Sequence, residues 1–478
     1  MGITYKVQSS LRRILPESVR PYKTILLKWM LFGGLVRVLL MPIFASGDLL
    51  SISSWSFFLK VNHQLILSND SPFIFYLQTF MYTIFGPLLP SRVFSDILSN
   101  TVYTPVGLSS LFRISSPGIL AFITVSKIPY LFFDFATALL LLHLVNDGRK
   151  AVQAFKLWIL SPVSLFVSYA IGQYDIIAVF FVMLALYFFA KNKTILAMLS
   201  LSVSSAIKMF GIFLIPPMIL IIIKRSTNAR AKAKILLLLL AIGSLPFILT
   251  QISLAVTPKV YESVNAALPH NDEFNGYFGK TFYSRGVPQP PFLQGLFTIA
   301  LNYSTSLKTY ILLGDVIYIF FLVYGLLLLT IIWQDNWPLE KVWKAFLVIF
   351  LAYYAVALFL PQWFLWAQPL LVLLVLKERR FLKLYLISLP LFFVYTWYWN
   401  QSLTSNLLAP AFNQAYFWPG PIDLMNNIGL PGIQVVNVFR SLLSAVCIFI
   451  AVVIAMSGAR ANLPRISFWR VEEEDKKE

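Results

Sequence analysis

The sequence predicts an all-α polytopic membrane protein, and three properties of the chain lead to that class. Of its 478 residues, 58% are hydrophobic and only 12% are charged. The mean hydropathy is +0.76, and a water-soluble protein of this length would need a far more polar surface. Apolar runs long enough to cross a bilayer as helices also follow one another along the chain. We therefore predict a single transmembrane domain over residues 1–478 with about twelve membrane-spanning helices.

The predicted spans begin close to the first residues and continue almost to the last. They occupy residues 25–45, 118–145, 154–171, 173–190, 194–208, 209–223, 234–256, 309–333, 341–360, 362–376, 383–398 and 434–457. The small residues Ala45, Ser46 and Gly47 after the first run would also suit a cleaved signal peptide. However, Arg37 interrupts that run and its length suits a span, so we predict an uncleaved anchor.

The run at 72–90 decides the orientation, because it could either span the membrane or lie in the interface as an aromatic-rich amphipathic segment. With a cytosolic N-terminus and 72–90 not spanning, most of the 38 Lys and Arg residues fall in cytosolic segments, as the positive-inside rule requires. These segments include 224–234, 377–383 and the charged tail at 458–478. A spanning 72–90 would place them outside. We predict the first arrangement, in a multi-pass protein of the plasma membrane or endoplasmic reticulum.

Three long segments then lie on the external or lumenal side, at 46–117, 257–308 and 399–433. Their length and aromatic content indicate a functional role rather than simple connection. The formal net charge of +18 could indicate a nucleic-acid partner. In this protein class, cytosolic Lys and Arg residues facing anionic lipid headgroups explain it, so we predict membrane lipid and no nucleic acid as partners.

Four basic residues lie within predicted spans, all toward the external leaflet: Arg37, Lys127, Lys208 and Arg440. Ionisable residues inside a membrane are functional candidates by default. Guanidinium and ammonium groups are also the usual ligands of phosphate, so this set would suit a lipid phosphate. The alternative is internal pairing, because Asp134 lies seven residues after Lys127 on the same face of a helix.

Two carboxylates lie at the external ends of predicted spans. Asp48 directly follows the first span, and Asp175 begins the helix that re-enters from outside, in the turn "GQYD" at 172–175. Either one could simply stabilise a helix N-terminus. Asp48 also lies just above Arg37, and a carboxylate beside a basic, half-dry pocket suits deprotonation of a hydroxyl. Asp48 is therefore the predicted general base.

Other chemistries find little support in the sequence. His63, His143 and His270 show no metal-ligand spacing, and the stretch "HNDE" at 270–273 reads better as a solvated loop than as a divalent-metal site. We therefore predict no metal and no cofactor. The single cysteine, Cys447, excludes intrachain disulfides. Neither a Walker loop nor a dinucleotide fingerprint is present.

Several of these stretches together resemble the GT-C glycosyltransferases, most closely the branch that uses dolichyl- or polyprenyl-phosphate mannose. The resemblance covers most of the helical portion. It rests on Asp48 followed by Trp55, "KIPYLFFDFATALLLL", "WILSPVSLFVSYAIGQYDIIAVFFVMLAL", "SAIKMFGIFLIPP" and "LPQWFLWAQPLL". Many relatives carry a two-acid or His-Asp pattern in the first loop. Here Gly47 precedes Asp48, so the base would be a lone carboxylate and a metal requirement is doubtful.

The resemblance implies a GT-C-like arrangement of helices and an inverting glycosyltransferase acting on the external or lumenal face. A sugar, mannose by the closest branch, would pass from a polyprenyl-phosphate carrier to a hydroxyl of a lipid-linked or glycan acceptor. Asp48 would be the catalytic base, and Arg37, Lys127, Lys208 and Arg440 would bind the donor phosphate. The sugar- and acceptor-binding residues would be Gln173, Tyr174, Asp175, His270, Gln362, Trp363 and Trp366.

Two other functions stay open at this stage. A transporter or flippase of a lipid-linked or anionic substrate would explain the spans and the intramembrane charges. Transporters usually carry internal repeats and place their polar sites near the midplane, and the sequence shows neither. A non-catalytic scaffold of a membrane complex would tolerate the loss of Asp48, whereas an enzyme would not.

Overall fold

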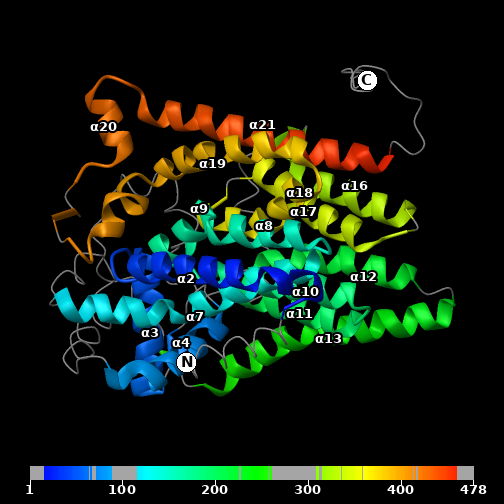
Figure 1. The fold of residues 1–478 in the computed structure, drawn as a ribbon, viewed down its shortest axis with the longest axis horizontal. Helices are drawn as coiled ribbons and strands as arrows, with labels where there is room; N and C mark the ends of the chain where they lie inside the picture. The colour runs from blue at the N-terminus through cyan, green and yellow to red at the C-terminus, as the bar shows by residue number, and fades with distance from the viewer. Residues whose placement is uncertain are drawn as a thin grey trace.

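The computed structural model describes residues 15–63, 65–66, 71–88, 116–225, 228–257, 259–260, 308–311, 315–334, 336–357, 359–412, 414–415 and 418–459. Over these residues the protein is helical almost throughout, and Figure 1 shows the long helices lying side by side. The strands are very short and form two pairs: β1 (Leu65–Ile66) runs parallel to β2 (Lys259–Val260), and β3 (Lys308–Ile311) runs antiparallel to β4 (Asp315–Tyr318).

The helices follow one another with short turns of 3-10 helix between many of them. Up to the middle of the chain they are η1 (Glu17–Tyr22), α2 (Lys23–Leu40), α3 (Gly47–Asn62), α4 (Pro72–Phe85), η2 (Gly86–Leu88), α7 (Ser116–Leu144), α8 (Gly148–Ile159), α9 (Pro162–Leu165), the π-helix η3 (Phe166–Ile171), α10 (Asp175–Ala190), α11 (Thr194–Ile207), η4 (Met209–Leu214), α12 (Ile215–Lys224) and α13 (Ala229–Val256). After the strands they are α16 (Ile319–Trp333), α17 (Leu339–Val356), η8 (Pro361–Ala367), α18 (Gln368–Lys377), η9 (Arg379–Phe381), α19 (Leu382–Thr396), η10 (Trp397–Leu403), η11 (Ser405–Leu408), α20 (Pro421–Asn427) and α21 (Gly432–Ala459).

Length and composition make this a helical membrane protein. Within the described residues, five helical segments are long and apolar enough to cross a membrane: Gly118–Leu144, Gly148–Ile171, Ala229–Leu249, Arg379–Leu403 and Gly432–Ser457. Shorter apolar helices cover Asp175–Ala190, Thr194–Ile207, Met209–Lys224 and Ile319–Trp333. The span predicted over 309–333 is wrong at its start, because helix α16 begins only at Ile319. There β3 and β4 form a hairpin rich in β-branched and aromatic residues, which favour strands.

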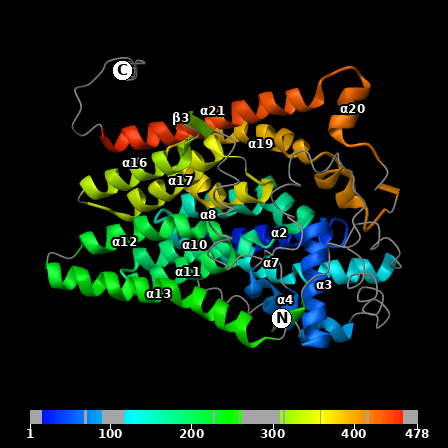
Figure 2. The same cartoon turned by 180° about the vertical axis from the view of Figure 1, so that it is seen from behind.

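The two ends of the helix bundle differ in construction. Figures 1 and 2 show α3 crossing the direction of the long helices at one end, where α20 also lies; we call this the α3–α20 end. Helix α4 packs beside α3, and its 14 residues extend about 21 Å, less than the ~30 Å hydrocarbon core of a bilayer. The N-cap residue of α4, Ser71, joins it to the end of α11, because Ser71 Oγ donates to the Ala206 carbonyl at 2.6 Å.

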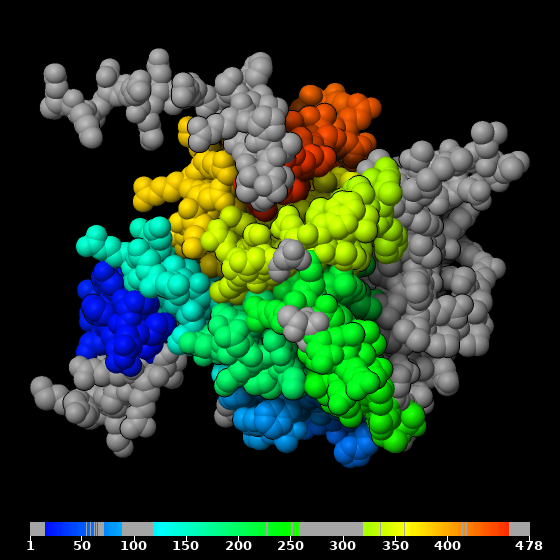
Figure 3. All heavy atoms as spheres, turned by 90° about the vertical axis from the view of Figure 1, so that its right-hand side faces the viewer, coloured from blue at the N-terminus to red at the C-terminus, as the bar shows by residue number. Residues whose placement is uncertain are grey.

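Charged side chains tie the helices together at the opposite end, onto which Figure 3 looks. Lys224 Nζ donates to the carbonyls of Ile332 and Gln334 at 2.5 Å each, and so closes the C-terminus of α16 against α12. Lys344 on α17 pairs with Glu378, after α18, at 2.9 Å. Partial burial raises the pKa of Glu378, but the hydrogen bonds from Lys344 and Arg380 outweigh it, so the pKa lies below its ordinary value.

The core of the bundle surrounds α10, α17 and α18, whose side chains are buried on nearly every face. Helices α2, α13 and α21 instead expose rows of large apolar side chains, including Leu35, Leu237 and Phe449. A helix that is apolar and exposed suits contact with lipid, because hydrocarbon does not penalise such a surface. The buried helix α10 starts at the turn 172–175, so that turn is anchored to the core of the bundle.

Candidate functional site

The turn at 172–175 is shaped by the π-helix η3 that precedes it and by a glycine. The amides of Gly172 and Gln173 both donate to the Val167 carbonyl at 3.0 Å, and Gly172 has a φ of +80°. A Cβ at Gly172 would lie 2.6 Å from Leu49 Cδ2 on α3. Only glycine combines this left-handed conformation with so close an approach. The turn therefore lies directly against the first turn of α3.

Gln173 connects this turn to the predicted base. Its Nε2 donates to Asp48 Oδ2 at 2.8 Å, and Gln173 itself is buried. Asp48 is exposed and lies in the first turn of α3, where the helix dipole favours a carboxylate. Ser46 caps the same helix by accepting from the Leu49 amide at 3.3 Å, and the Ser46 amide donates to the Ile171 carbonyl at 3.1 Å. Asp48 is thus both exposed to solvent and fixed in position.

Tyr174 connects the turn to the predicted phosphate ligand Lys208. The Lys208 ammonium lies 2.9 Å from the Tyr174 hydroxyl and 4.1 Å from the centre of its ring. Lys208 follows α11 in an extended conformation, with φ −143° and ψ 129°, and its side chain is half-buried. Asp48 and Lys208 are therefore held by two consecutive residues of one turn, which brings a carboxylate and an ammonium to the same region.

Asp175 connects the turn to η8. Its Oδ1 accepts from the Trp366 indole nitrogen at 2.7 Å, and Asp175 is fully buried. The Trp366 ring stacks on Phe210, with ring centres 3.6 Å apart, and Phe210 lies two residues after Lys208. Trp363 also stacks near Trp366, at 5.2 Å. The three polar residues of the turn thus join α3, the end of α11 and η8.

The predicted sugar-stacking role of the tryptophans does not fit their surroundings. Trp363 is 8% exposed and Trp366 is 5% exposed, because both rings pack among other aromatic rings. Gln362 is buried as well. These side chains therefore pack beneath the protein surface, where Trp366 bonds Asp175 of the turn, and they do not form an exposed aromatic surface for a sugar. His270, also predicted to contact sugar or acceptor, lies outside the described residues.

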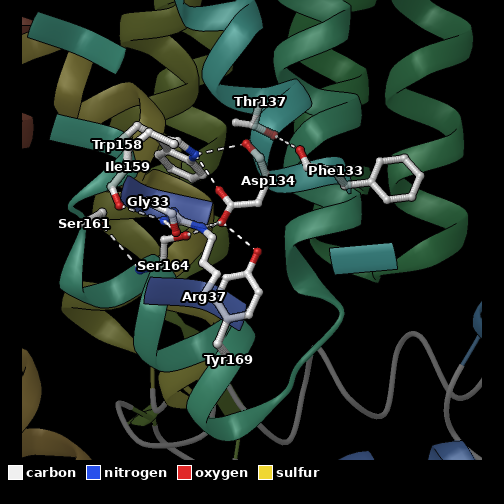
Figure 4. Close-up of polar contacts among 10 residues, drawn as sticks. All are labelled: Gly33, Arg37, Phe133, Asp134, Thr137, Trp158, Ile159, Ser161, Ser164 and Tyr169. Carbon is white, nitrogen blue, oxygen red and sulfur yellow. Dashed lines mark hydrogen bonds and ion pairs between the residues drawn. The ribbon is translucent and has the colours of Figure 1, made fainter. Parts of the chain in front are cut away.

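Arg37 is committed to a buried ion pair, which argues against the predicted role in phosphate binding. Its Nε lies 2.7 Å from Asp134 Oδ2, and both side chains are fully buried (Figure 4). Arg37 Nη1 also donates to the carbonyls of Gly33 and Ile159. The pairing proposed between Lys127 and Asp134 is therefore wrong, because α2 packs against α7 and presents Arg37 to the carboxylate.

Asp134 receives further donors from the elements that surround it. Trp158 Nε1 donates to Oδ1 at 2.6 Å, and the Tyr169 hydroxyl donates to Oδ2 at 3.0 Å. Ser164 Oγ lies 3.4 Å from the same oxygen. The close-up in Figure 4 shows all of these groups converging on one carboxylate. A buried charge pair needs such additional hydrogen bonds to offset its loss of hydration.

Lys127 and Arg440 also donate hydrogen bonds to other groups of the protein. Lys127 Nζ donates to the carbonyls of Met41, Phe44 and Tyr169. Arg440 Nη2 donates to the carbonyls of Tyr354 and Ala357, and Nη1 donates to Ser444 Oγ, which ties α21 to the end of α17. Of the four predicted phosphate ligands, Lys208 is the one that contacts a residue of the turn, Tyr174.

No group of three or more His, Cys, Asp or Glu side chains gathers within the described ranges. Comparison of the chain with protein-family models, with characterised proteins and with solved structures finds no match.

Several residues that shape the site were not predicted from the sequence. Ser46 and Gly172 set the backbone around Asp48 and the turn, and Phe210 stacks on Trp366. The sequence did contain a signal for Ser46, because Ser is a preferred N-cap residue and it directly precedes a helix-forming stretch. The position of Phe210 depends on how η4 packs on η8, which no local pattern reveals.

Proposed function

We propose that this protein is an inverting glycosyltransferase that uses a polyprenyl-phosphate sugar, with mannose as the first sugar to test, and an acceptor hydroxyl on a lipid-linked or other glycan. One observation carries the proposal. Gln173, Tyr174 and Asp175, three consecutive residues, hold Asp48, Lys208 and Trp366 respectively. An exposed carboxylate and a partly buried ammonium brought together in this way can supply a base and a phosphate ligand.

In the proposed reaction Asp48 accepts the proton of the acceptor hydroxyl. The acceptor oxygen forms a bond to the anomeric carbon of the sugar while the bond from that carbon to the phosphate oxygen breaks. The electron pair of the broken bond leaves with the polyprenyl phosphate, and a single displacement inverts the configuration. Lys208 stabilises the negative charge that develops on the departing phosphate.

Gln173 has a defined part in this scheme. Its amide N–H donates to Asp48 Oδ2 at 2.8 Å and so fixes the orientation of the carboxylate that accepts the proton. Because an amide is neutral, it orients the carboxylate without pairing with its charge. Gln173 is therefore a positioning residue, whereas Asp48 touches the reacting hydroxyl.

The proposed orientation follows the distribution of charge. Lysine and arginine residues gather at the opposite end, for example Lys191, Lys224, Arg225, Lys344 and Arg380. By the positive-inside rule this end would face the cytosol, and the α3–α20 end with Asp48 would face the external or lumenal side. The proposal includes about twelve spans in a GT-C-like arrangement, with α3 and α4 lying in the interface.

The test is sugar transfer by the purified protein, with a panel of radiolabelled polyprenyl-phospho-sugars as donors and total membrane lipid extract as acceptor. We expect product from the wild type and a loss of about 10² to 10⁴ in rate for Asp48→Asn, the usual contribution of a general base. Asp147→Asn is the matched control, because Asp147 caps α8 at the opposite end and asparagine caps equally well.

Lys208→Met completes the assay and should raise the KM for the donor as well as lower kcat. Equal rates for wild type and Asp48→Asn would remove Asp48 from the mechanism. No product from any donor would refute the glycosyltransferase and favour the transporter or flippase.

A further inference from the structure

Lys127 occupies an unusual place in the bundle. It lies on α7 and is fully buried, and none of the ion pairs found among the described residues includes it. Its ammonium donates to the carbonyls of Met41 at 3.0 Å, Tyr169 at 2.7 Å and Phe44. An ammonium has three N–H donors and no acceptor, so its capacity is filled by backbone carbonyls.

The three carbonyls belong to the two segments that carry the candidate site. Met41 and Phe44 lie in the connection from α2 to α3, and Phe44 precedes Asp48 by four residues. Tyr169 lies in η3 and precedes Gln173 by four residues. In a π-helix the backbone hydrogen bonds shift from the α-helical pattern, and such turns are frequent at functional sites. Lys127 therefore bonds both segments one turn away from the Asp48–Gln173 contact.

We propose that Lys127 is a positioning residue, which holds the α2–α3 connection and η3 in register so that Gln173 meets Asp48. This inference rests on the proposed function for its catalytic consequence, but its structural content is independent of it. A side chain without donors at this position would deprive buried carbonyls in both segments of a partner, which is costly wherever water cannot replace it.

The arrangement also explains why phosphate is not the ligand of Lys127. A phosphate oxygen could approach this ammonium only by displacing one of the three carbonyls, and the displaced carbonyl would then be buried without a donor. Lys208 lies beside the Tyr174 hydroxyl instead, and it is half-buried rather than fully buried. The two lysines therefore have separate tasks.

The direct test is amide hydrogen exchange on the full-length protein, comparing the wild type with Lys127→Met. We expect exchange to become at least about tenfold faster in peptides covering both 41–50 and 166–175, while α18 stays unchanged. Lys60→Met is the matched control, because Lys60 also donates to one backbone carbonyl, that of Tyr82. This control should leave 166–175 as protected as in the wild type.

Kinetics then separate positioning from phosphate binding. For Lys127→Met we expect kcat to fall at least about tenfold while the donor KM stays within about twofold, since the base is misplaced but Lys208 remains. A raised donor KM with unchanged protection in both segments would instead identify Lys127 as a phosphate ligand and overturn the proposal.

Unchanged exchange in either segment of the folded variant would also overturn it. If Lys127→Met does not accumulate in the membrane, Lys127→Gln takes its place, because glutamine keeps two N–H donors. In this variant we expect amide exchange in the peptides covering 41–50 and 166–175 to become at least about threefold faster. If the wild type transfers no sugar from any donor, the proposed function fails, and the exchange data still decide whether Lys127 holds the two segments together.

Discussion

Replacing Arg37 with methionine tests whether the ion pair with Asp134 is a structural element. Methionine keeps much of the length and apolar volume of the side chain, so the change mainly removes charge. It leaves the Asp134 carboxylate buried with neutral donors alone, from Trp158, Tyr169 and Ser164. Breaking a buried ion pair by removing one partner typically costs about 3–5 kcal/mol, because the remaining charge is uncompensated.

The double variant Arg37→Met, Asp134→Asn sharpens the test. Asparagine retains an oxygen that can accept from Trp158 or Tyr169 and carries no charge, so we expect it to recover most of the loss, to within about 1–2 kcal/mol of the wild type. For a chain of 478 residues the unfolding entropy is about 1 kcal/mol/K, so the single variant should lower Tm by about 3–5 °C.

Thermal unfolding in detergent, followed by tryptophan fluorescence, measures both changes, and Asp134→Asn alone completes the double-mutant cycle. If Arg37→Met is as stable as the wild type, or if the double variant is less stable than both single variants, the ion pair is not a structural element.

Three further predictions follow from contacts elsewhere in the bundle. The pKa of Glu378 is lower in the folded protein than in the unfolded chain, so its pairing with Lys344 stabilises the protein fully at pH values above the pKa of this glutamate in the unfolded chain. This stabilisation is lost as the pH falls through the pKa of Glu378 in the folded protein. The Tm of the wild type should therefore converge with the Tm of Glu378→Gln on acidification, and parallel curves would refute the link. Gly172→Ala should lower Tm by about 1–3 °C and reduce sugar transfer, because alanine is strained in the left-handed conformation and its methyl group meets Leu49 of α3. A variant with unchanged Tm and rate would contradict this close approach. Trp366→Phe keeps an aromatic ring but removes the donor to Asp175, so we expect a loss of about 1–3 kcal/mol in unfolding free energy, and no loss would show that the indole bond is dispensable.

The broad class and the site turn could be predicted from the sequence, because both depend on local pattern. Composition and apolar runs predict a helical membrane protein, and the polar turn at 172–175 interrupts one of those runs. Asp48 lies beside that turn, where Gln173 donates to its Oδ2. Sequence pattern is less informative about helix length, as the hairpin of β3 and β4 within a predicted span illustrates.

The partners of the buried charges could not be predicted in the same way. Spacing along one helix suggested Lys127 and Asp134 as a pair, since residues seven apart share a face. The observed partner, Arg37, lies 97 residues from Asp134 in the sequence and on a different helix. Spacing shows which residues share a face of a helix, but the neighbour that meets this face is determined by tertiary packing.

The connection between α2 and α3 has a consequence for how the protein is made. The amide of Ala45, three residues before Asp48, donates to the Leu407 carbonyl at 2.9 Å, and the next amide donates to Ile171. Asp48 is therefore synthesised long before Ile171 and Leu407, whose carbonyls bond the backbone just before it. The backbone partner of Ala45 becomes available only after η11 has been synthesised. Assembly of the backbone contacts just before Asp48 is in this sense a late event of biogenesis.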